Sequence, residues 1–149
     1  MLPLGSAFPK VDGMDVNRHK LSTKDLVNDS NYTLIIMWDS WCPPCRAQMP
    51  AYKKIFKKYH AKGLSVIAIT EDWDFNDWIK VIKSEQTGQW IHLFPDNENK
   101  TSDQLGVSAI PADFLLKNGK VVGKYGGADT KATSLDDLLD KLAEIFNSQ

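Results

Sequence analysis

The chain has 149 residues, of which 42% are hydrophobic, and its 18 Lys and Arg against 19 Asp and Glu leave a formal net charge of −1. This balance argues against nucleic acid as a partner, because nucleic-acid-binding domains present a basic surface. The longest apolar run covers residues 34–38, far short of the ~20 residues of a membrane-spanning helix, and two cysteines are too few for a disulfide-stabilised mini-protein. We expect one globular domain over residues 1–149.

Strand and helix patterns alternate along the chain. Short runs of apolar and β-branched residues are typical of strands buried on both faces, and apolar residues spaced three and four apart are typical of helices that cover a sheet. In chain order we expect a small hairpin around Asp12-Gly13, a short helix at 23–27, strands at 33–38 and 64–70 around a helix at 47–60, a helix from 75, a strand at 91–94, a short helix at 101–105, strands at 114–116 and 121–125, and a final helix from 135.

Residues with strong local preferences mark the ends of several of these elements. The side chains of Asp74 and Ser134 are of the types that cap helix N-termini, and Ser134 opens a capping box. Gly63 ends the first long helix, and Asn118-Gly119 predicts a tight hairpin turn because both residues tolerate a positive φ. Alternating strands and helices that finish in a hairpin and a helix predict a three-layer α/β fold, with a central mixed sheet flanked by helices.

The two cysteines, Cys42 and Cys45, lie directly between the first buried strand and the first long helix. A group at the carboxyl end of a central strand lies at the edge where α/β sheets place their sites. The residue before a proline disfavours helical backbone, so we expect Cys42 and Pro43 to be non-helical and Pro44 to lie in the first helical turn. Free backbone donors at a helix N-terminus lower a thiol pKa. Cys42 is therefore the predicted nucleophile, and Cys45 the residue that resolves the mixed disulfide.

A structural disulfide and a zinc site are less convincing explanations of the cysteine pair. A disulfide that closes so short a loop adds only about 2 kcal/mol of stability, less than a long-range crosslink gives. A tetrahedral zinc site needs four ligands, yet there is no second cysteine pair, and His19, His60 and His92 show no ligand spacing. We therefore expect no metal and no other cofactor, and we expect each histidine to be an ordinary surface or half-buried residue.

The segment from Met37 to Arg46 resembles the strand-to-helix signature of the thioredoxin superfamily, and in particular that of the TlpA/ResA-like thiol–disulfide oxidoreductases. Pro50 matches the proline that kinks the active-site helix, and residues 105–111 resemble the segment that leads into the family's cis-proline. The likeness covers most of the chain. It implies a thioredoxin-like fold in which residues 1–30 form an N-terminal hairpin extension and residues 74–94 a central helix–strand insertion.

The resemblance also implies an activity and further site residues. The activity is exchange of the dithiol or disulfide with partner-protein disulfides, as a reductase outside the cytoplasm that an upstream dithiol donor recycles. A cis bond before Pro111 would place its loop against the cysteines, with Ile110 offering backbone groups to an incoming peptide. Trp41, Pro43 and Pro44 are expected to support the site. We expect a monomer.

Two positions depart from the family pattern. Ile36 stands six residues before the first cysteine, where thioredoxin carries a buried acid, so no acid at that position serves Cys45. Gln48 occupies a position that is often acidic in relatives, which removes one charge from the active-site helix.

Other acids lie close to the predicted site. ResA-like proteins place a glutamate near the end of the strand that follows the first long helix, and Glu71 and Asp72 lie in that region. Asp39, three residues before Cys42, is a further candidate. We take Glu71 and Asp39 as candidate acid–base groups, and the alternative for all three acids is a solvated loop carboxylate.

The tryptophans divide into two groups. Trp38 and Trp78 lie in buried patterns and are expected in the core. Trp41 is expected to border a substrate groove, and Trp73 either joins it there or packs against its neighbours.

Two other functions remain as alternatives. Tryparedoxin-like and nucleoredoxin-like electron relays also carry Trp-Cys-Pro-Pro-Cys-Arg, and a thioredoxin-fold domain could bind partners without using its cysteines. The peroxiredoxin pattern Pro-x-x-x-Thr-x-x-Cys does not occur, so we expect no peroxidase activity. Residues 1–9 contain no basic segment followed by an apolar stretch, so we expect no signal peptide or anchor within this chain.

Overall fold

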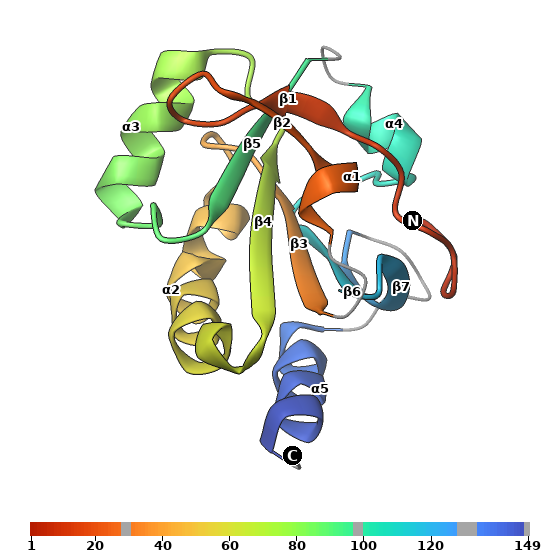
Figure 1. The fold of residues 1–149 in the computed structure, drawn as a ribbon. Helices are drawn as coiled ribbons and strands as arrows, with labels where there is room; N and C mark the ends of the chain where they lie inside the picture. The colour runs from red at the N-terminus through yellow and green to blue at the C-terminus, as the bar shows by residue number, and fades with distance from the viewer. Residues whose placement is uncertain (28–30, 97–99, 128–133, 148–149) are drawn as a thin grey trace.

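A mixed β-sheet forms the centre of the computed structural model, which describes residues 1–27, 31–96, 100–127 and 134–147 (Figure 1). The strands are β1 (Asp12–Met14), β2 (Lys20–Ser22), β3 (Tyr32–Trp38), β4 (Leu64–Thr70), β5 (Ile91–Pro95), β6 (Ala112–Lys117) and β7 (Lys120–Gly126). Within the described residues these seven strands lie in the order β2-β1-β5-β4-β3-β6-β7. The central strands β5, β4 and β3 are parallel, whereas the β6–β7 hairpin and the β1–β2 hairpin add antiparallel strands at the two sides.

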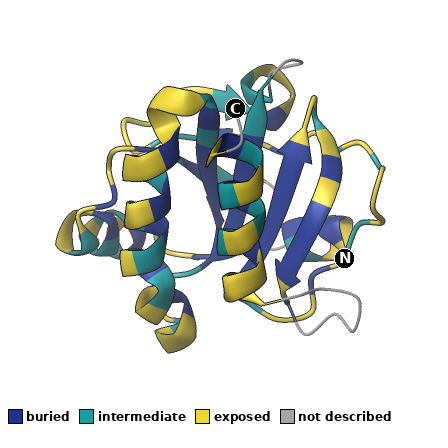
Figure 2. Ribbon diagram, turned by 90° about the horizontal axis from the view of Figure 1, so that it is seen from below, coloured by how far each residue is buried: buried dark blue, intermediate teal, exposed yellow. Residues whose placement is uncertain are grey.

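Helices cover both faces of the sheet, with their buried sides turned toward it (Figure 2). They are α1 (Thr23–Leu26), α2 (Pro43–Tyr59), α3 (Phe75–Glu85), α4 (Thr101–Leu105) and α5 (Leu135–Asn147), and a 3-10 turn, η1 (His60–Lys62), follows α2. One core cluster joins α2, α3 and α5 to the sheet and includes Trp38 and Trp78, while the other lies on the opposite face and includes Phe114. The expected three-layer α/β fold is confirmed.

None of the described helices is both long enough and apolar enough to cross a bilayer.

Most of the expected element boundaries are confirmed. Strand β4 and helix α4 have the expected bounds, and the side chain of Asp74 accepts the backbone N–H three residues on, at 3.0 Å. Gly63 ends the first long helical segment with φ 111°, and Asn118 has φ 53° in the β6–β7 turn. Ser134 and Asp137 exchange the two hydrogen bonds of a capping box, at 3.2 and 3.3 Å. These ends were predictable because each depends on neighbouring residues only.

The position of the N-terminal hairpin turn is a correction. Asp12 and Gly13 lie within β1, and the turn follows them, where Asp15 Oδ1 accepts the backbone N–H groups of Asn17 and His19 at 2.8 and 2.9 Å. An Asp-Gly pair favours a turn, but Gly13 is needed in the strand for a different reason. A Cβ atom at Gly13 would overlap the carbonyl oxygen of Phe94 on β5.

This close approach gives a prediction for Gly13→Ala. The added methyl would force β1 away from β5, and overpacking of this kind costs about 1–3 kcal/mol in the free energy of unfolding. Chemical denaturation of the variant and the wild type measures this loss. Gly88→Ala is the matched control, because a Cβ there would meet nothing within 4 Å. Equal losses in the two variants would contradict the predicted clash.

Candidate active site

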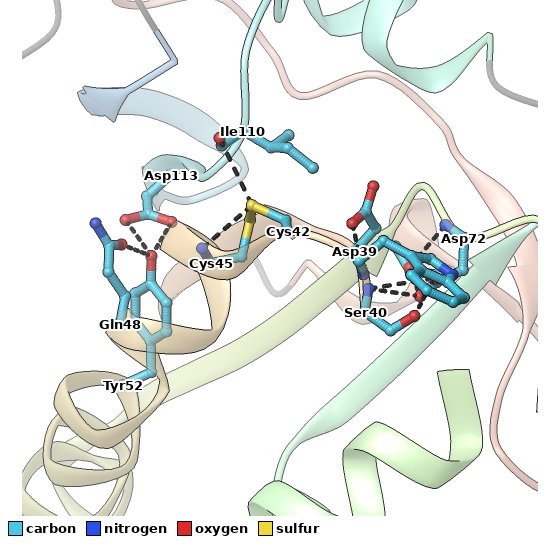
Figure 3. Close-up of a disulfide and its surroundings, with 11 residues drawn as sticks. Asp39, Ser40, Cys42, Cys45, Gln48, Tyr52, Asp72, Ile110 and Asp113 are labelled. Atoms are coloured by element: carbon cyan, nitrogen blue, oxygen red, sulfur yellow. Dashed lines mark hydrogen bonds between the residues drawn. A yellow bond between two sulfur atoms is a disulfide. The ribbon is translucent and has the colours of Figure 1, made fainter. Parts of the chain in front are cut away.

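Cys42 and Cys45 form a disulfide at the N-terminus of α2, with their Cα atoms 5.2 Å apart (Figure 3). Cys42 is the N-cap residue and has extended backbone, while Cys45 lies in the first turn. The backbone N–H of Cys45 donates to Cys42 Sγ at 3.2 Å, and the N–H of Arg46 donates to the Cys42 carbonyl at 3.0 Å. The helix therefore directs one of its free N-terminal donors at the Cys42 sulfur, as the sequence predicted.

The expected backbone of Pro43 is wrong. Helix α2 begins at Pro43, so both Pro43 and Pro44 are helical. A proline in the first turn sacrifices no hydrogen bond, because the first N–H groups of a helix have no partner within it, and its fixed φ suits the helix. These advantages outweigh the preference of a pre-proline residue for extended backbone. Neither proline can donate to Cys42, so the nearest following donor is the N–H of Cys45.

The two sulfur atoms differ in exposure. Cys42 is half-buried, whereas Cys45 is 0% exposed and belongs to the core between α2 and the sheet. The Ile110–Pro111 bond is cis, as the resemblance implied. The carbonyl oxygen of Ile110 lies 3.8 Å from Cys42 Sγ. The loop before β6 therefore lies against the more exposed sulfur, which leaves Cys45 enclosed behind it.

An acidic groove lies beside Cys42. It has a volume of about 330 Å³, and the residues that line it are Asp39, Trp41, Glu71, Asp72, Trp73 and Asp74. Trp41 and Trp73 are 75% and 84% exposed, whereas Trp38 and Trp78 are in the core as expected. Trp73 thus joins Trp41 at the groove.

The structure brings the candidate acids Asp39 and Glu71 together in this groove. Burial raises the pKa of Asp39, and the charge of Asp72 raises it further. Burial also raises the pKa of Glu71, with the charge of Asp39 as the next cause. In the described part of the chain, no hydrogen bond links either carboxyl to a cysteine sulfur.

Asp72 has a structural position in this groove. It is 7% exposed, and its carboxylate accepts the backbone N–H of Ser40 at 3.1 Å, the Ser40 hydroxyl at 2.5 Å and the Thr70 hydroxyl at 2.6 Å. These bonds tie the loop after β3 to the end of β4, and so hold the segment that leads into Cys42. The alternative of a solvated loop carboxylate is therefore wrong for Asp72.

A buried polar group lies on the Cys45 side of the disulfide, away from the acidic groove (Figure 3). Asp113 of β6 is 3% exposed, and the Tyr52 hydroxyl lies 2.9 Å from each of its carboxyl oxygens and 2.6 Å from Gln48 Oε1. Burial raises the pKa of Asp113 to about 7. Sequence reasoning missed this residue, and the one signal for it is a single acid inside the apolar run of β6.

The expectation for His92 is also wrong. His92 of β5 is 3% exposed and lies among aromatic rings, with its centroid 5.7 Å from that of Trp90. Its Nε2 lies 2.7 Å from the carbonyl oxygen of Thr87. Burial lowers the pKa of His92 to about 4. Among the described residues, no group of three or more His, Cys, Asp and Glu side chains is placed to hold a metal ion.

Comparison with known proteins agrees with this geometry. Residues 4–124 match the model of the AhpC/TSA family. The "Thiol-disulfide oxidoreductase ResA" of Bacillus thuringiensis (strain Al Hakam) is 30% identical over 142 residues, which cover 95% of this chain and 79% of the relative.

Solved structures agree as well. The thioredoxin domain of a thiol-disulfide oxidoreductase from Bacteroides vulgatus has a TM-score of 0.82 and 24% identity, and covers 99% of this chain and 100% of its own. A putative thiol:disulfide interchange protein DsbE from Chlorobium tepidum has a TM-score of 0.80 and 25% identity, over 97% and 98% of the two chains. The fold is thioredoxin-like, and the chain belongs to the AhpC/TSA family as a ResA-like thiol–disulfide oxidoreductase.

Proposed function

We propose that this thiol–disulfide oxidoreductase reduces disulfides of partner proteins, with Cys42 as the nucleophile and Cys45 as the resolving cysteine. One observation carries the proposal: the half-buried Cys42 sulfur receives the N–H of Cys45, while the Cys45 sulfur is enclosed. A thiolate at Cys42 would be stabilised by that donor and by the helix N-terminus, and a partner disulfide could reach it.

The exchange has two steps. The Cys42 thiolate attacks one sulfur of the partner disulfide, and the other partner sulfur leaves as a thiolate. Cys45, once deprotonated, then attacks Cys42 Sγ, and the second partner sulfur leaves. The partner gains two electrons and two protons, and Cys42 and Cys45 become the disulfide seen in the structure.

The proline pair supports the direction of electron flow. A strong oxidase such as DsbA, at about −120 mV, stabilises its reduced form, whereas thioredoxin lies at about −270 mV. Pro43 and Pro44 remove two backbone donors between the cysteines, which limits stabilisation of a Cys42 thiolate. We expect a potential nearer that of thioredoxin, and a measured value above about −150 mV would contradict a reductase.

The residues around Cys42 supply the partner-binding surface in this proposal. The Ile110 carbonyl and the cis-Pro111 loop lie against Cys42 and can pair with an extended peptide backbone. Trp41, with Trp73, offers an exposed aromatic wall to the same partner. Pro43 and Pro44 shape the start of α2.

Asp39 and Glu71 are proposed as acid–base groups on the partner side of Cys42. Their place in the groove beside Trp41 and the upward shift of both pKa values support this assignment. A carboxyl that holds its proton nearer neutral pH can deliver it to the departing partner thiolate.

The compartment and the assembly are part of the same proposal. The resemblance to extracytoplasmic ResA-like proteins supports a location outside the cytoplasm. We therefore propose an extracytoplasmic monomer that acts on protein thiols and disulfides, forms a single thioredoxin-like domain, and is recycled by an upstream dithiol donor.

A trapping experiment tests the exchange. Cys45→Ser should leave Cys42 joined to partner proteins as stable mixed disulfides, because the second step is blocked. Adducts are detected in the native host by non-reducing electrophoresis and identified by mass, and the Cys42→Ser, Cys45→Ser double variant is the matched control.

The outcomes separate the alternatives. Partner binding that persists in the double variant, with no adduct in Cys45→Ser, would identify a non-catalytic binding module. Robust turnover with a tryparedoxin peroxidase would instead identify an electron relay of the tryparedoxin type. Either result would overturn the proposed reductase.

A further inference from the structure

Asp113 is a buried carboxyl group in a strand whose other buried residues are apolar. Its neighbours across the sheet are Ile36 on β3 and Tyr125 on β7, and Leu115 follows it on the same face of β6. Burying a carboxylate without a compensating cation is costly, and no ion pair involves Asp113 in the described part of the molecule. A buried carboxyl group whose charged form is this unfavourable is a candidate for a functional role.

The position of Asp113 relative to Cys45 follows from helix α2. Cys45, Gln48 and Tyr52 are spaced three and four residues apart, so they share the face of α2 that packs on the sheet. Side chains in a helix lean toward its N-terminus. The Tyr52 hydroxyl accordingly meets the side chain of Gln48. Gln48 follows Cys45 by three residues, which is about one helical turn, or roughly 5 Å along the helix axis. Asp113 is bound to that hydroxyl, and Figure 3 shows its carboxyl on the Cys45 side of the disulfide.

The hydrogen bonds of Asp113 suit both of its protonation states. When the carboxyl is ionised, the Tyr52 hydroxyl can donate to either of its oxygens, each 2.9 Å away. When the carboxyl is protonated, it can donate to the Tyr52 oxygen while the Tyr52 hydroxyl donates to Gln48 Oε1 at 2.6 Å. Rotation of one hydroxyl converts one arrangement into the other. Tyr52 has a single proton to donate, so Gln48 Oε1 gives up this donor when Asp113 is ionised, and Gln48 is only half-buried.

We propose that Asp113 is the proton acceptor of Cys45 in the resolving step, positioned by Tyr52 and Gln48. This inference rests on the exchange mechanism proposed above. In the mixed disulfide, the ionised Asp113 takes the proton of the Cys45 thiol, and the Cys45 sulfur attacks Cys42 Sγ. The bond from Cys42 to the partner breaks, and the partner sulfur leaves with the electron pair. The proton on Asp113 then passes to that thiolate or to water.

Two phenols face Asp113 from the neighbouring elements, and both stay neutral near pH 7. Tyr52 faces it from α2, and burial raises the pKa of Tyr52 well above its ordinary value, so the phenol stays neutral. Tyr125 faces it from β7, and its pKa is raised by burial and by Asp137 of α5. Lys124 pairs in register with Phe114 and therefore lies on the other face of the sheet. No described residue of β3 that faces Asp113 is charged, because its partner there is Ile36.

Asp113→Asn tests the proposal through the rate of the second step. Reduced protein reacts with dithiobis(nitrobenzoate), which releases one coloured thiolate when Cys42 attacks and a second when Cys45 resolves the adduct. This leaving group needs no proton, so the second phase reports the attack by Cys45 alone. We expect the variant to slow that phase by about 100-fold near neutral pH, the usual contribution of a general base, and to change the first phase little.

The pH profile separates this role from a structural one. In the wild type the rate of the second phase should rise with an inflection near the Asp113 pKa of about 7, and the inflection should be absent in Asp113→Asn. Tyr52→Phe removes the donor that stabilises the carboxylate and should move the inflection to higher pH. Asp136→Asn removes the same charge from an exposed site on α5 and is expected to retain the wild-type profile.

The outcomes are distinct. An unchanged or faster second phase in Asp113→Asn would overturn the assignment, because loss of a nearby negative charge by itself would favour the Cys45 thiolate and speed its attack. If wild-type protein shows no second phase at all, the exchange mechanism itself fails, whatever Asp113 does.

Discussion

Asp113→Asn is expected to stabilise the protein at neutral and alkaline pH. Burial raises the pKa of Asp113 from 3.8 to about 7. Between these values the folded state binds a proton that the unfolded state releases, so the free energy of unfolding falls as the pH rises through this range. A shift of this size corresponds to about 4 kcal/mol. Asparagine resembles the protonated acid and does not titrate, so the variant escapes this loss.

The measurement is the difference in free energy of unfolding between Asp113→Asn and the wild type, from urea denaturation of the oxidised proteins. We expect the difference to grow in favour of the variant by about 4 kcal/mol from pH ~4 to pH ~8. Asp136→Asn, an exposed acid on α5, should retain the wild-type pH dependence. A difference that stays constant with pH would show that Asp113 ionises as easily in the folded protein as in the unfolded chain.

Asp113 lowers the stability of the fold, and in the proposed mechanism it speeds the attack of Cys45 on Cys42. This combination would explain why β6 carries an acid. The same substitution is expected to raise stability and to slow the attack by Cys45. Active sites often combine these two effects, because a catalytic group is held in surroundings that disfavour its charged form. A purely structural Asp113 would show the stability change without the change in rate.

Sequence reasoning reached the parts of the site that depend on local chemistry. The Cys42–Cys45 spacing, the helix N-terminus at Cys42 and the strand before it follow from neighbouring residues, and the structure has them where they were expected. The Asp74 cap and the Asn118 turn are similar cases. Local preferences failed at Pro43, where the helix overrode the pre-proline restriction, and at Asp12-Gly13, where contact with β5 decided the conformation.

The residues that were missed owe their properties to distant parts of the chain. Ile36 stands where thioredoxin carries a buried acid, and the structure has a carboxyl directly across the strand pair from it, on Asp113. This pairing joins β3 to β6 and leaves no trace in the residues around either position. His92 is a similar case, because the rings that enclose it come from β3, α3 and the segment before β5.

His92→Gln is expected to remove an acid sensitivity from the fold. Burial lowers the pKa of His92 from 6.5 to about 4. Below pH 6.5 the unfolded chain binds a proton that the folded protein does not, so this group lowers the free energy of unfolding as the pH falls toward 4, by about 3 kcal/mol in all. Glutamine can still donate to the Thr87 carbonyl but does not titrate. The exposed His60→Gln variant is the control and should retain the wild-type pH dependence.

His92 and Asp113 act in opposite directions over the same range of pH, and this makes a sharper test possible. Acidification from pH 6.5 to 4 is unfavourable to the fold through His92 and favourable through Asp113. Strands β4 and β3 lie between β5, which carries His92, and β6, which carries Asp113. The two residues are therefore roughly 14 Å apart, and their effects on the free energy of unfolding should add. Asp113→Asn alone should then lose stability on acidification, His92→Gln alone should gain it, and the double variant should follow the wild type. A double variant that behaves like either single one would show that one of the two groups does not titrate as its burial requires.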